Sequence, residues 1–346
     1  MLDASQPLGE LHRHLDGAVR LSTILDLARQ HGLALPADTE ETLAPFVQID
    51  GSEPGLLAFL ERFRYLTEIL VDEDACRRVA YENVEDAAKE GLSYVELRFS
   101  PWFMAERHGL VAEAVVEACL DGLRAGQQDF GVEAEAIGIL SRSYGPELCE
   151  RELQALLTCR DRLVAIDLAG DEAGFPAALF RDHFRQVRDA GLHVTVHAGE
   201  AAGPDSVWSA IRDLGAERIG HGFRAAEDPE LVAYLVHNDI GLECCPTSNL
   251  HIQAVASYAQ HPIRQLAEAG VRFCLNTDDP AISAITIGHE YEVAGPAAGL
   301  SPAQLAQAQT ESLELAFISA DRKQALRNRF GQRLQGAAYD AAKPGD

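Results

Sequence analysis

Eight short β-rich runs alternate with stretches of helical periodicity in this chain, and this alternation is the feature that most limits its fold. The helical stretches include 74–91 and 111–126, which place apolar residues every three or four positions and end at a glycine. Repeated β-then-α units predict a parallel sheet, and eight of them suit a closed (β/α)8 TIM-type barrel. The eight runs are residues 9–14, 93–100, 133–141, 163–170, 192–199, 217–223, 240–246 and 271–279.

An open, doubly wound α/β sheet is the alternative to the barrel. The barrel is favoured because run after run ends in a polar, chemically active side chain, and barrels collect such side chains at the carboxyl ends of their strands. We therefore expect one site at that rim, within a single catalytic domain over residues 1–346. The strand-end side chains are His12, His14, Glu96, Arg98, Ser141, Arg142, Asp167, His197, His221, Asp278 and Asp279.

Composition excludes several classes of protein. With 346 residues, 47% of them hydrophobic and 24% charged, the chain is long enough for one barrel with a sizeable core. The formal net charge of -25 would repel nucleic acid, so no polynucleotide partner is expected. The first ten residues lack the regions of a signal peptide, and no apolar run is long enough to span a membrane. We expect a cytoplasmic protein whose seven cysteines are mostly buried, reduced thiols.

The interval between the first and second β-rich runs breaks the regular alternation. Residues 15–74 form a long insertion that contains a strongly amphipathic helical stretch, 56–70. A helical insertion at the catalytic rim of a barrel is a candidate active-site lid. The alternative is that the insertion only plugs the end of the barrel.

The sequence predicts a metal site. Residues i and i+2 of a strand face the same way, so His12 and His14 can reach a single ion. His197 adds a third imidazole at the end of an apolar run, and Asp278 adds a carboxylate oxygen. Three histidines and one carboxylate suit zinc, with room for a water molecule. A second ion would need a bridging group such as a modified lysine, and none of the three lysines lies at a strand end, so we expect one Zn²⁺ per chain.

Two further residues suit hydrolysis. Zinc lowers the pKa of water from about 15.7 to about 7, so hydroxide becomes available at neutral pH. His221, beside an acid such as Asp278, can orient that hydroxide. Attack on a carbon–nitrogen double bond leaves negative charge on the nitrogen unless an acid protonates it. Glu200 is the candidate acid, and burial would raise its pKa towards that task.

Each of these residues also has a structural interpretation. Glu200 could be a helix-start acid for the helical stretch that follows soon after. His221, between two glycines, could be a histidine satisfied within the core. Asp278 and Asp279 could cap the next turn. Neighbours on a strand point in opposite directions, so these two acids are expected to have different partners.

Six motifs occur in a fixed order, and together they resemble the motif set of the adenosine deaminase family. The segments SYVELRFSP and ILSRSYG resemble the bacterial form of this family, and the likeness covers nearly the whole chain. It implies zinc-dependent hydrolytic deamination of adenosine and 2′-deoxyadenosine to inosine and deoxyinosine, with release of ammonia, in purine salvage and within the amidohydrolase superfamily. The motifs are ELHRHLDG (10–17), DLAGDE (167–172), TVHAGEAAGP (195–204), ERIGHG (217–222), CPTSN (245–249) and NTDDP (276–280).

The resemblance implies a role for each matching residue. Glu200 matches the residue that protonates N1 of the purine, and His221 matches the one that orients the zinc-bound hydroxide attacking C6. The matching zinc ligands are His12, His14, His197 and Asp278. The matching substrate contacts are His14, Asp16 for the ribose 5′-hydroxyl, Gly170 for N3 through its backbone N–H, and Asp279 for N7. The matching hydrophobic gate is Leu56, Phe59, Leu60 and Phe63.

One segment departs from the family pattern known in animals. CPTSNLHIQ (245–253) lacks the aromatic residue of the animal segment, which makes contacts near the 5′ end of the nucleoside less secure. Related enzymes act on adenine or on 5′-substituted nucleosides. Two other classes remain open, namely a barrel hydrolase of amides or esters and a nucleoside-binding protein without turnover. We expect a small-molecule nucleoside ligand and no obligate protein partner.

Overall fold

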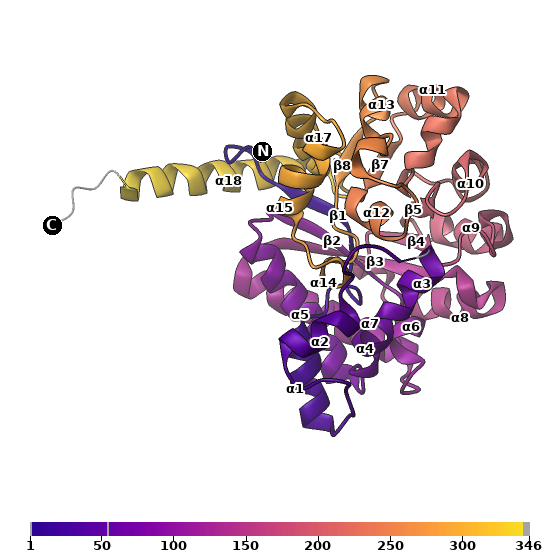
Figure 1. The fold of residues 1–346 in the computed structure, drawn as a ribbon, viewed down its shortest axis with the longest axis vertical. Helices are drawn as coiled ribbons and strands as arrows, with labels where there is room; N and C mark the ends of the chain where they lie inside the picture. Colours follow the sequence, from indigo (N-terminus) through magenta and orange to yellow (C-terminus); the bar gives the residue numbers. More distant parts are fainter. Residues whose placement is uncertain (1, 54, 342–346) are drawn as a thin grey trace.

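Eight parallel strands form the centre of the molecule, and each pairs with the next in sequence order, from β1 to β8 (Figure 1). The structure, a computed structural model, describes residues 2–53 and 55–341. All eight predicted runs contain a strand, so the predicted barrel is confirmed. The strands are β1 (Gly9–His14), β2 (Tyr94–Phe99), β3 (Glu133–Ser141), β4 (Ala165–Ala169), β5 (His193–Ala198), β6 (Arg218–His221), β7 (Gly241–Cys244) and β8 (Phe273–Leu275).

The barrel closes between β1 and the chain that follows β8. The backbone N–H of His14 donates to the carbonyl of Asp278 at 2.8 Å, and the N–H of Asp278 donates to the carbonyl of His12 at 3.0 Å. The side-chain oxygen of Asn276 accepts from the N–H of Leu11 at 2.8 Å. An open sheet would leave these groups unpaired, so the doubly wound alternative is wrong. The residues that close the barrel are also residues of the predicted site.

The helices between strands follow from local sequence signals. In α5 (Glu73–Lys89), the side chain of Asp72 accepts from the N–H of Ala75 at 2.9 Å and so caps the first turn. In α7 (Ala112–Phe130), Gly131 ends the helix with a φ of 69°. The other helices after β2 are α6 (Pro101–Ala105), α8 (Pro146–Leu157), α9 (Arg181–Asp189), α10 (Pro204–Ser209), α11 (Pro229–His237), α12 (Pro246–His251), α13 (Ile263–Glu268), α14 (Pro280–Ser283), α15 (Ile287–His289), α16 (Gly295–Ala297), α17 (Pro302–Glu314) and α18 (Ala320–Ala341).

The described residues between β1 and α5 are largely helical. The amphipathic stretch expected over 56–70 is divided, because a 3-10 turn at Glu61–Phe63 separates its two short helices. Figure 1 shows these indigo and violet segments gathered together, with α3 in front of the strands. Whether they move as a lid stays a prediction. The helices are α1 (Leu21–His31), α2 (Glu40–Val47), α3 (Leu56–Leu60) and α4 (Arg64–Glu68).

The segment after α17 seals the amino-terminal end of the barrel. Arg218 donates to the backbone carbonyl of Leu315 at 2.8 Å, and the N–H of Phe317 donates to the Glu96 carboxylate at 2.8 Å. The Phe317 ring lies 3.6 Å from the Arg218 guanidinium. Leu315 also joins a small hydrophobic cluster with Tyr94, which is separate from the main core. The catalytic rim and the sealed end are therefore opposite ends of one barrel.

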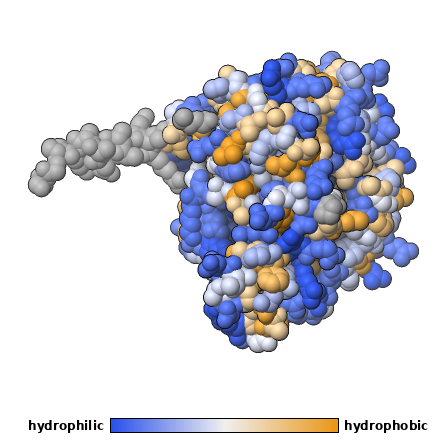
Figure 2. Space-filling model, viewed as in Figure 1, coloured by the Kyte–Doolittle hydropathy of each residue, from blue (hydrophilic) through white to orange (hydrophobic). Residues whose placement is uncertain are grey.

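The surface drawn in Figure 2 is largely hydrophilic. Figure 2 shows hydrophobic residues in separate groups among hydrophilic ones on the face drawn in Figure 1.

The seven cysteines are free thiols, and all of them except the partly exposed Cys159 are buried, as expected. Among the helices of the described residues, none combines the length and the hydropathy needed to cross a bilayer.

Close packing of α7 on α5 yields a test of the fold. A Cβ on Gly122 would lie 2.2 Å from the backbone oxygen of Arg77, which cannot swing away as a side chain can. We expect Gly122→Ala to lower the free energy of unfolding by about 1–3 kcal/mol, although alanine favours helix over glycine. The midpoint of urea unfolding measures this change.

Gly331→Ala in α18 is the matched control, since no atom lies within 4 Å of a Cβ built there. Alanine is expected to raise stability at that position by about 0.5–1 kcal/mol. If both variants shift the unfolding midpoint in the same direction, the close contact of α5 and α7 is not as the structure places it.

Candidate active site and metal centre

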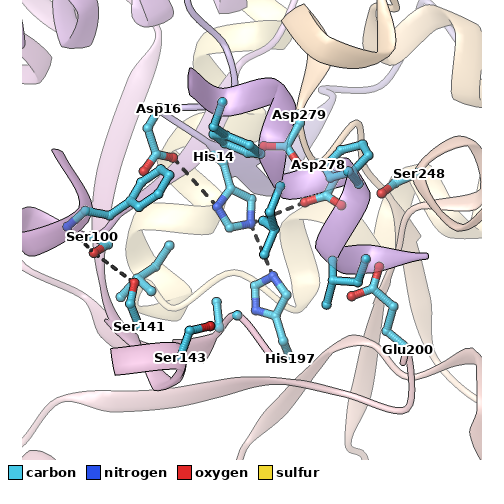
Figure 3. Close-up of a pocket in the computed structure, with 18 of the residues that line it drawn as sticks. His14, Asp16, Ser100, Ser141, Ser143, His197, Glu200, Ser248, Asp278 and Asp279 are labelled. Carbon is cyan, nitrogen blue, oxygen red and sulfur yellow. Dashed lines mark hydrogen bonds and ion pairs between the residues drawn. The ribbon is translucent and has the colours of Figure 1, made fainter. Parts of the chain in front are cut away.

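A cavity of about 230 Å³ opens at the carboxyl ends of the strands, under α3 (Figure 3). The structure brings all but one of the predicted site residues to its wall. The exception is His12, which is fully buried within the barrel but reaches the same cluster of imidazoles. The predicted residues that line the cavity are His14, Asp16, Leu56, Phe59, Leu60, Phe63, Gly170, His197, Glu200, His221, Asp278 and Asp279.

Imidazoles and a carboxylate converge at one end of this cavity. His12, His197, His221 and Asp278 each offer a donor atom within 4.8 Å of the others. His14 belongs to the same group, because its Nε2 lies 3.2 Å from Nε2 of His197 and 3.2 Å from Oδ1 of Asp278. The geometry thus supplies five candidate ligands, one more than the predicted set.

A buried ion-pair network fixes the proton on His12. Nδ1 of His12 lies 2.8 Å from the carboxylate of Glu243. Burial disfavours the charge on Glu243, but Arg98 and Arg218, each 2.7 Å away, outweigh it and hold its pKa well below the usual range. Glu243 can only accept, so His12 donates through Nδ1 and its Nε2 carries a bare lone pair. That buried Nε2 has no hydrogen-bond partner and faces Asp278 Oδ1, another acceptor, at 3.2 Å.

His197 is arranged in the same way. Its Nδ1 lies 2.9 Å from Asp167, and burial lowers the pKa of the imidazole to about 4, so the ring is neutral. Burial opposes ionisation of Asp167, but His197 and Arg98 outweigh it and lower the pKa of the carboxyl. The Nε2 lone pair of His197 therefore points at His14. The bare Nε2 of His12 and Oδ1 of Asp278 are both acceptors and lie 3.2 Å apart, a contact that a cation between them would stabilise, so this donor set fits a metal ion.

A second chain of hydrogen bonds sets the tautomer of His221 differently. The N–H of Ile263 donates to Nδ1 of His261 at 3.1 Å, so Nε2 of His261 carries the proton and donates to Asn249 at 3.2 Å. The amide nitrogen of Asn249 then donates to Nδ1 of His221 at 3.1 Å. Nε2 of His221 must carry a proton, and it faces Oδ2 of Asp278 at 3.7 Å. His221 thus presents a donor to the cluster, whereas a metal ligand must present a lone pair.

The two adjacent acids have different partners, as expected. Asp278 has a φ of 64°, a left-handed conformation that is rare outside glycine and that turns its carboxylate towards the imidazoles. Asp279 points into the cavity, where its Oδ1 is buried without a partner. Burial and the charges of Asp278 and Asp16 raise the pKa of Asp279 well above its usual value. Its side chain makes no capping hydrogen bond to α14, so the helix-cap interpretation of Asp279 is wrong.

Glu200 lies in the loop after β5. Gly199, with a φ of 70°, turns the chain so that Glu200 faces the cavity with only 5% of its surface exposed. Burial, followed by the charges of Asp278 and Glu172, raises the pKa of this carboxyl well above its usual value, which favours its protonated form. The next helix, α10, begins only at Pro204, so the helix-start interpretation is wrong.

Sequence reasoning missed the residue that holds this loop. Glu172 accepts four hydrogen bonds from consecutive backbone N–H groups, those of residues 199, 200, 201 and 202, at 2.6, 3.2, 2.7 and 2.9 Å. It also missed Asn249 on α12 and Glu243 on β7, which hydrogen-bond to the imidazoles of His221 and His12. The only sequence signal for Glu172 and Asn249 is that they lie within two of the six family motifs, DLAGDE and CPTSN. Glu243 is a single acid in an apolar run.

The rest of the cavity wall is partly apolar. Phe59 and Phe63 are 2% and 5% exposed and form the side contributed by the insertion. At the far end, Asp16 is buried with an unpaired Oδ1, and burial raises its pKa to about 6. Gly170 has a φ of 103°, and a Cβ there would lie 2.6 Å from the Ser143 hydroxyl, so only glycine fits.

Comparison with known proteins agrees with this geometry. A family model described as adenosine deaminase matches residues 7–332. An adenosine deaminase of Shewanella loihica is 58% identical over 94% of this chain and 98% of its own length. An adenosine deaminase of Klebsiella pneumoniae is 57% identical over 96% of this chain and 100% of its own length.

Solved structures agree at the level of the fold. An adenine deaminase from Arthrobacter aurescens superposes with a TM-score of 0.87 at 28% identity, covering 95% of this chain and 99% of its own. An amidohydrolase from Burkholderia ambifaria, solved with bound Zn, gives a TM-score of 0.85 at 26% identity, covering 98% of this chain and 94% of its own. Since the family model and both relatives extend over nearly its whole length, the chain belongs to the adenosine deaminase family.

Proposed function

We propose that this chain hydrolyses adenosine, and also 2′-deoxyadenosine, to inosine or deoxyinosine and ammonia. One observation carries the proposal. A single cavity holds both a buried carboxyl whose pKa is strongly raised, Glu200, and a set of donor atoms that fits a metal ion. The relatives at 57% and 58% identity, which are named adenosine deaminase, support adenosine as the substrate.

We assign one zinc ion to His12, His14, His197 and Asp278. When bound, zinc would lower the pKa of a water molecule so that hydroxide is available at neutral pH. Nitrogen donors with one carboxylate oxygen suit zinc, and the Zn-containing structure of similar fold supports this choice. His221 is left out of the ligand set because the hydrogen-bond chain through Asn249 places a proton on its inward nitrogen.

The residues of the chain then divide the chemistry. The Nε2–H of His221, together with Oδ2 of Asp278, orients the attacking water beside C6. As water adds to C6, the electron pair of the C6–N1 double bond moves to N1, and N1 takes the proton held by Glu200. One proton of the water passes through Asp278 to the amino group, which leaves as ammonia. The remaining hydroxyl proton returns to Glu200 as the C6–O double bond forms.

Other residues position the nucleoside. The protonated carboxyl of Asp279 donates to N7, and the backbone N–H of Gly170 donates to N3. His14 Nδ1 and Asp16 Oδ1 lie 3.9 Å apart, too far for a mutual hydrogen bond but close enough for one 5′-hydroxyl to contact both. We also propose that the insertion 15–74 acts as the lid, with Leu56, Phe59, Leu60 and Phe63 as its apolar inner surface. Closure would exclude water and strengthen each polar contact inside.

Charge around the cavity argues against phosphorylated substrates. Among the described residues that line the cavity there is no lysine or arginine, while four of them are acids. Some neighbours of similar fold, such as an N6-methyl-AMP deaminase from Arabidopsis thaliana at 27% identity, carry the name of a nucleotide substrate. A 5′-phosphate here would meet Asp16 without a compensating cation. Adenine alone would leave the Asp16 end of the cavity unfilled.

Glu200 distinguishes the deaminase from the other enzyme classes. A barrel hydrolase of amides or esters needs no acid aimed at a ring nitrogen, and a nucleoside-binding protein needs no metal.

We further propose that the enzyme works in the cytoplasm, in purine salvage, on a free nucleoside and without an obligate protein partner.

Removal of the metal should abolish activity and lower stability. Because a metal that binds only the folded state stabilises it, chelation is expected to lower the melting temperature, and added zinc should restore both properties. Elemental analysis should find one zinc per chain. His197→Ala should lose the zinc, whereas His193→Ala should keep it, because His193 lies exposed on the same strand and pairs with Glu217 instead. Zinc retained by His197→Ala would exclude the assigned ligand set.

Replacement of the proposed acid should remove turnover. Glu200→Gln keeps the shape but has no acidic proton, so kcat is expected to fall about 10²–10⁴-fold. The absorbance change from adenosine to inosine measures it, with the exposed Glu230→Gln as control. Because the pKa of Glu200 is raised and the protonated form is active, kcat/KM should fall as pH rises through that pKa. The residual activity of Glu200→Gln should lack this alkaline decline, and an unchanged decline would assign it to another group.

Asp279 should act as a hydrogen-bond donor. Asp279→Asn keeps a donor and should retain roughly tenfold more activity than Asp279→Ala, which keeps none. With 7-deazaadenosine, in which a C–H replaces N7, the two variants should become equivalent. Equal losses in both variants with adenosine itself would count against donation to N7.

A further inference from the structure

A chain of three polar side chains lies at the end of the cavity away from the metal cluster. Ser100 follows β2, Ser141 ends β3, and Glu152 lies on α8. The Ser141 hydroxyl donates to the Ser100 oxygen at 2.9 Å, and the Ser100 hydroxyl donates to Glu152 at 2.5 Å. In Figure 3, Ser100 and Ser141 lie on the same side of the cavity as Asp16, across from Glu200. The deamination chemistry proposed above makes no use of these three hydrogen-bonded side chains.

The surroundings of Glu152 fix the direction of these hydrogen bonds. Its Oε1 also accepts from the N–H of Trp102 at 3.2 Å, and its Oε2 accepts from the N–H of Ser141 at 2.7 Å. Backbone N–H groups only donate, so both oxygens accept from them. Burial raises the pKa of Glu152 to about 7, and above that pH the ionised carboxylate has no hydrogen to donate to Ser100. The oxygen of Ser100 also accepts from the N–H of Phe103 at 3.0 Å. The hydrogen of Ser100 therefore goes to Glu152, and its oxygen receives the hydrogen of Ser141.

This direction determines what Ser141 offers to a ligand. A hydroxyl has one hydrogen, and that of Ser141 is already used within the protein. Its oxygen therefore presents only lone pairs to the cavity, which it lines. A carboxylate at the head of the chain polarises both hydroxyls, so the Ser141 oxygen accepts more strongly than an isolated serine does. Glu152 and Ser100 are 1% and 2% exposed, so water does not disperse this effect.

The neighbouring group points to the same kind of ligand. The unpaired Oδ1 of Asp16 is also a buried acceptor on this side of the cavity. Two acceptors without a cation between them suit a ligand that carries several hydroxyl groups. With the purine at the metal end, this part of the nucleoside is the sugar.

We propose that Ser141, held as an acceptor by Ser100 and Glu152, binds a ring hydroxyl of the ribose, at C2′ or C3′, and so makes the site select nucleosides that carry it. This role rests on the adenosine deaminase activity proposed above. It is separate from the 5′-hydroxyl contact assigned to Asp16. Ser141 is a specificity-determining residue in this scheme and takes no part in the bond changes at C6.

The test compares three nucleosides on two forms of the full chain loaded with zinc. We expect the wild type to show a kcat/KM about tenfold lower for either 2′-deoxyadenosine or 3′-deoxyadenosine than for adenosine, because one hydroxyl contact is lost. Ser141→Ala should lower kcat/KM for adenosine by a similar factor and leave it unchanged for that deoxynucleoside. Because the comparison is a ratio between substrates on one protein, a partial loss of folded enzyme cancels.

Ser143→Ala is the matched control. Ser143 lines the same cavity, but its oxygen accepts from the N–H of Asp171 at 2.9 Å, so its replacement should affect the three nucleosides equally. If Ser141→Ala also changes all three by one factor, or changes none, the assigned role is overturned. If the wild type turns over none of them, the deaminase proposal fails instead. Calorimetric affinities of the same nucleosides then decide the role of Ser141, and equal discrimination in wild type and Ser141→Ala overturns it.

Discussion

The ion-pair network inside the barrel is the interaction on which the rest of the site depends. Barrel interiors are usually filled by branched apolar side chains, but here Arg98 and Arg218 bracket the carboxylate of Glu243. Charges removed from water are tolerated only when fully paired, and loss of one partner costs about 3–5 kcal/mol. Since Glu243 can only accept, it fixes the proton of His12 on Nδ1 and leaves Nε2 to face the metal position. The network thus decides which atoms face the metal.

Closure of the barrel and assembly of the metal site are one event. The backbone of Asp278 accepts a hydrogen bond from the N–H of His14 and donates one to the carbonyl of His12, and the side chains of all three residues face the metal position. The left-handed conformation of Asp278 is strained for a residue with a side chain, and such strain persists only where the surrounding structure holds it. A chain that fails to close would therefore lose its ligand set together with its fold.

Local sequence patterns predicted the strands and helices. They also predicted the site residues that lie at the ends of strands. The eight runs, His12 and His14 with i, i+2 spacing, and Glu200 after a glycine turn are all local signals. Glu172, Glu243 and the Asn249–His261 chain were missed because each acts through a contact made only in the folded state. The need for Gly17 was missed for the same reason, since a Cβ there would lie 1.7 Å from Asp279.

The seal at the amino-terminal end of the barrel has a consequence for the order in which the protein is made. Leu315 and Phe317 satisfy Arg218 and Glu96, which belong to the same network as Glu243. Until this segment has left the ribosome, the buried Arg218 and Glu96 of a nascent chain lack these partners. The proposed metal ligands come from β1, from β5 and from the segment after β8, and their alignment also depends on residues 315–317. The site can therefore assemble only after residues 315–317 have left the ribosome.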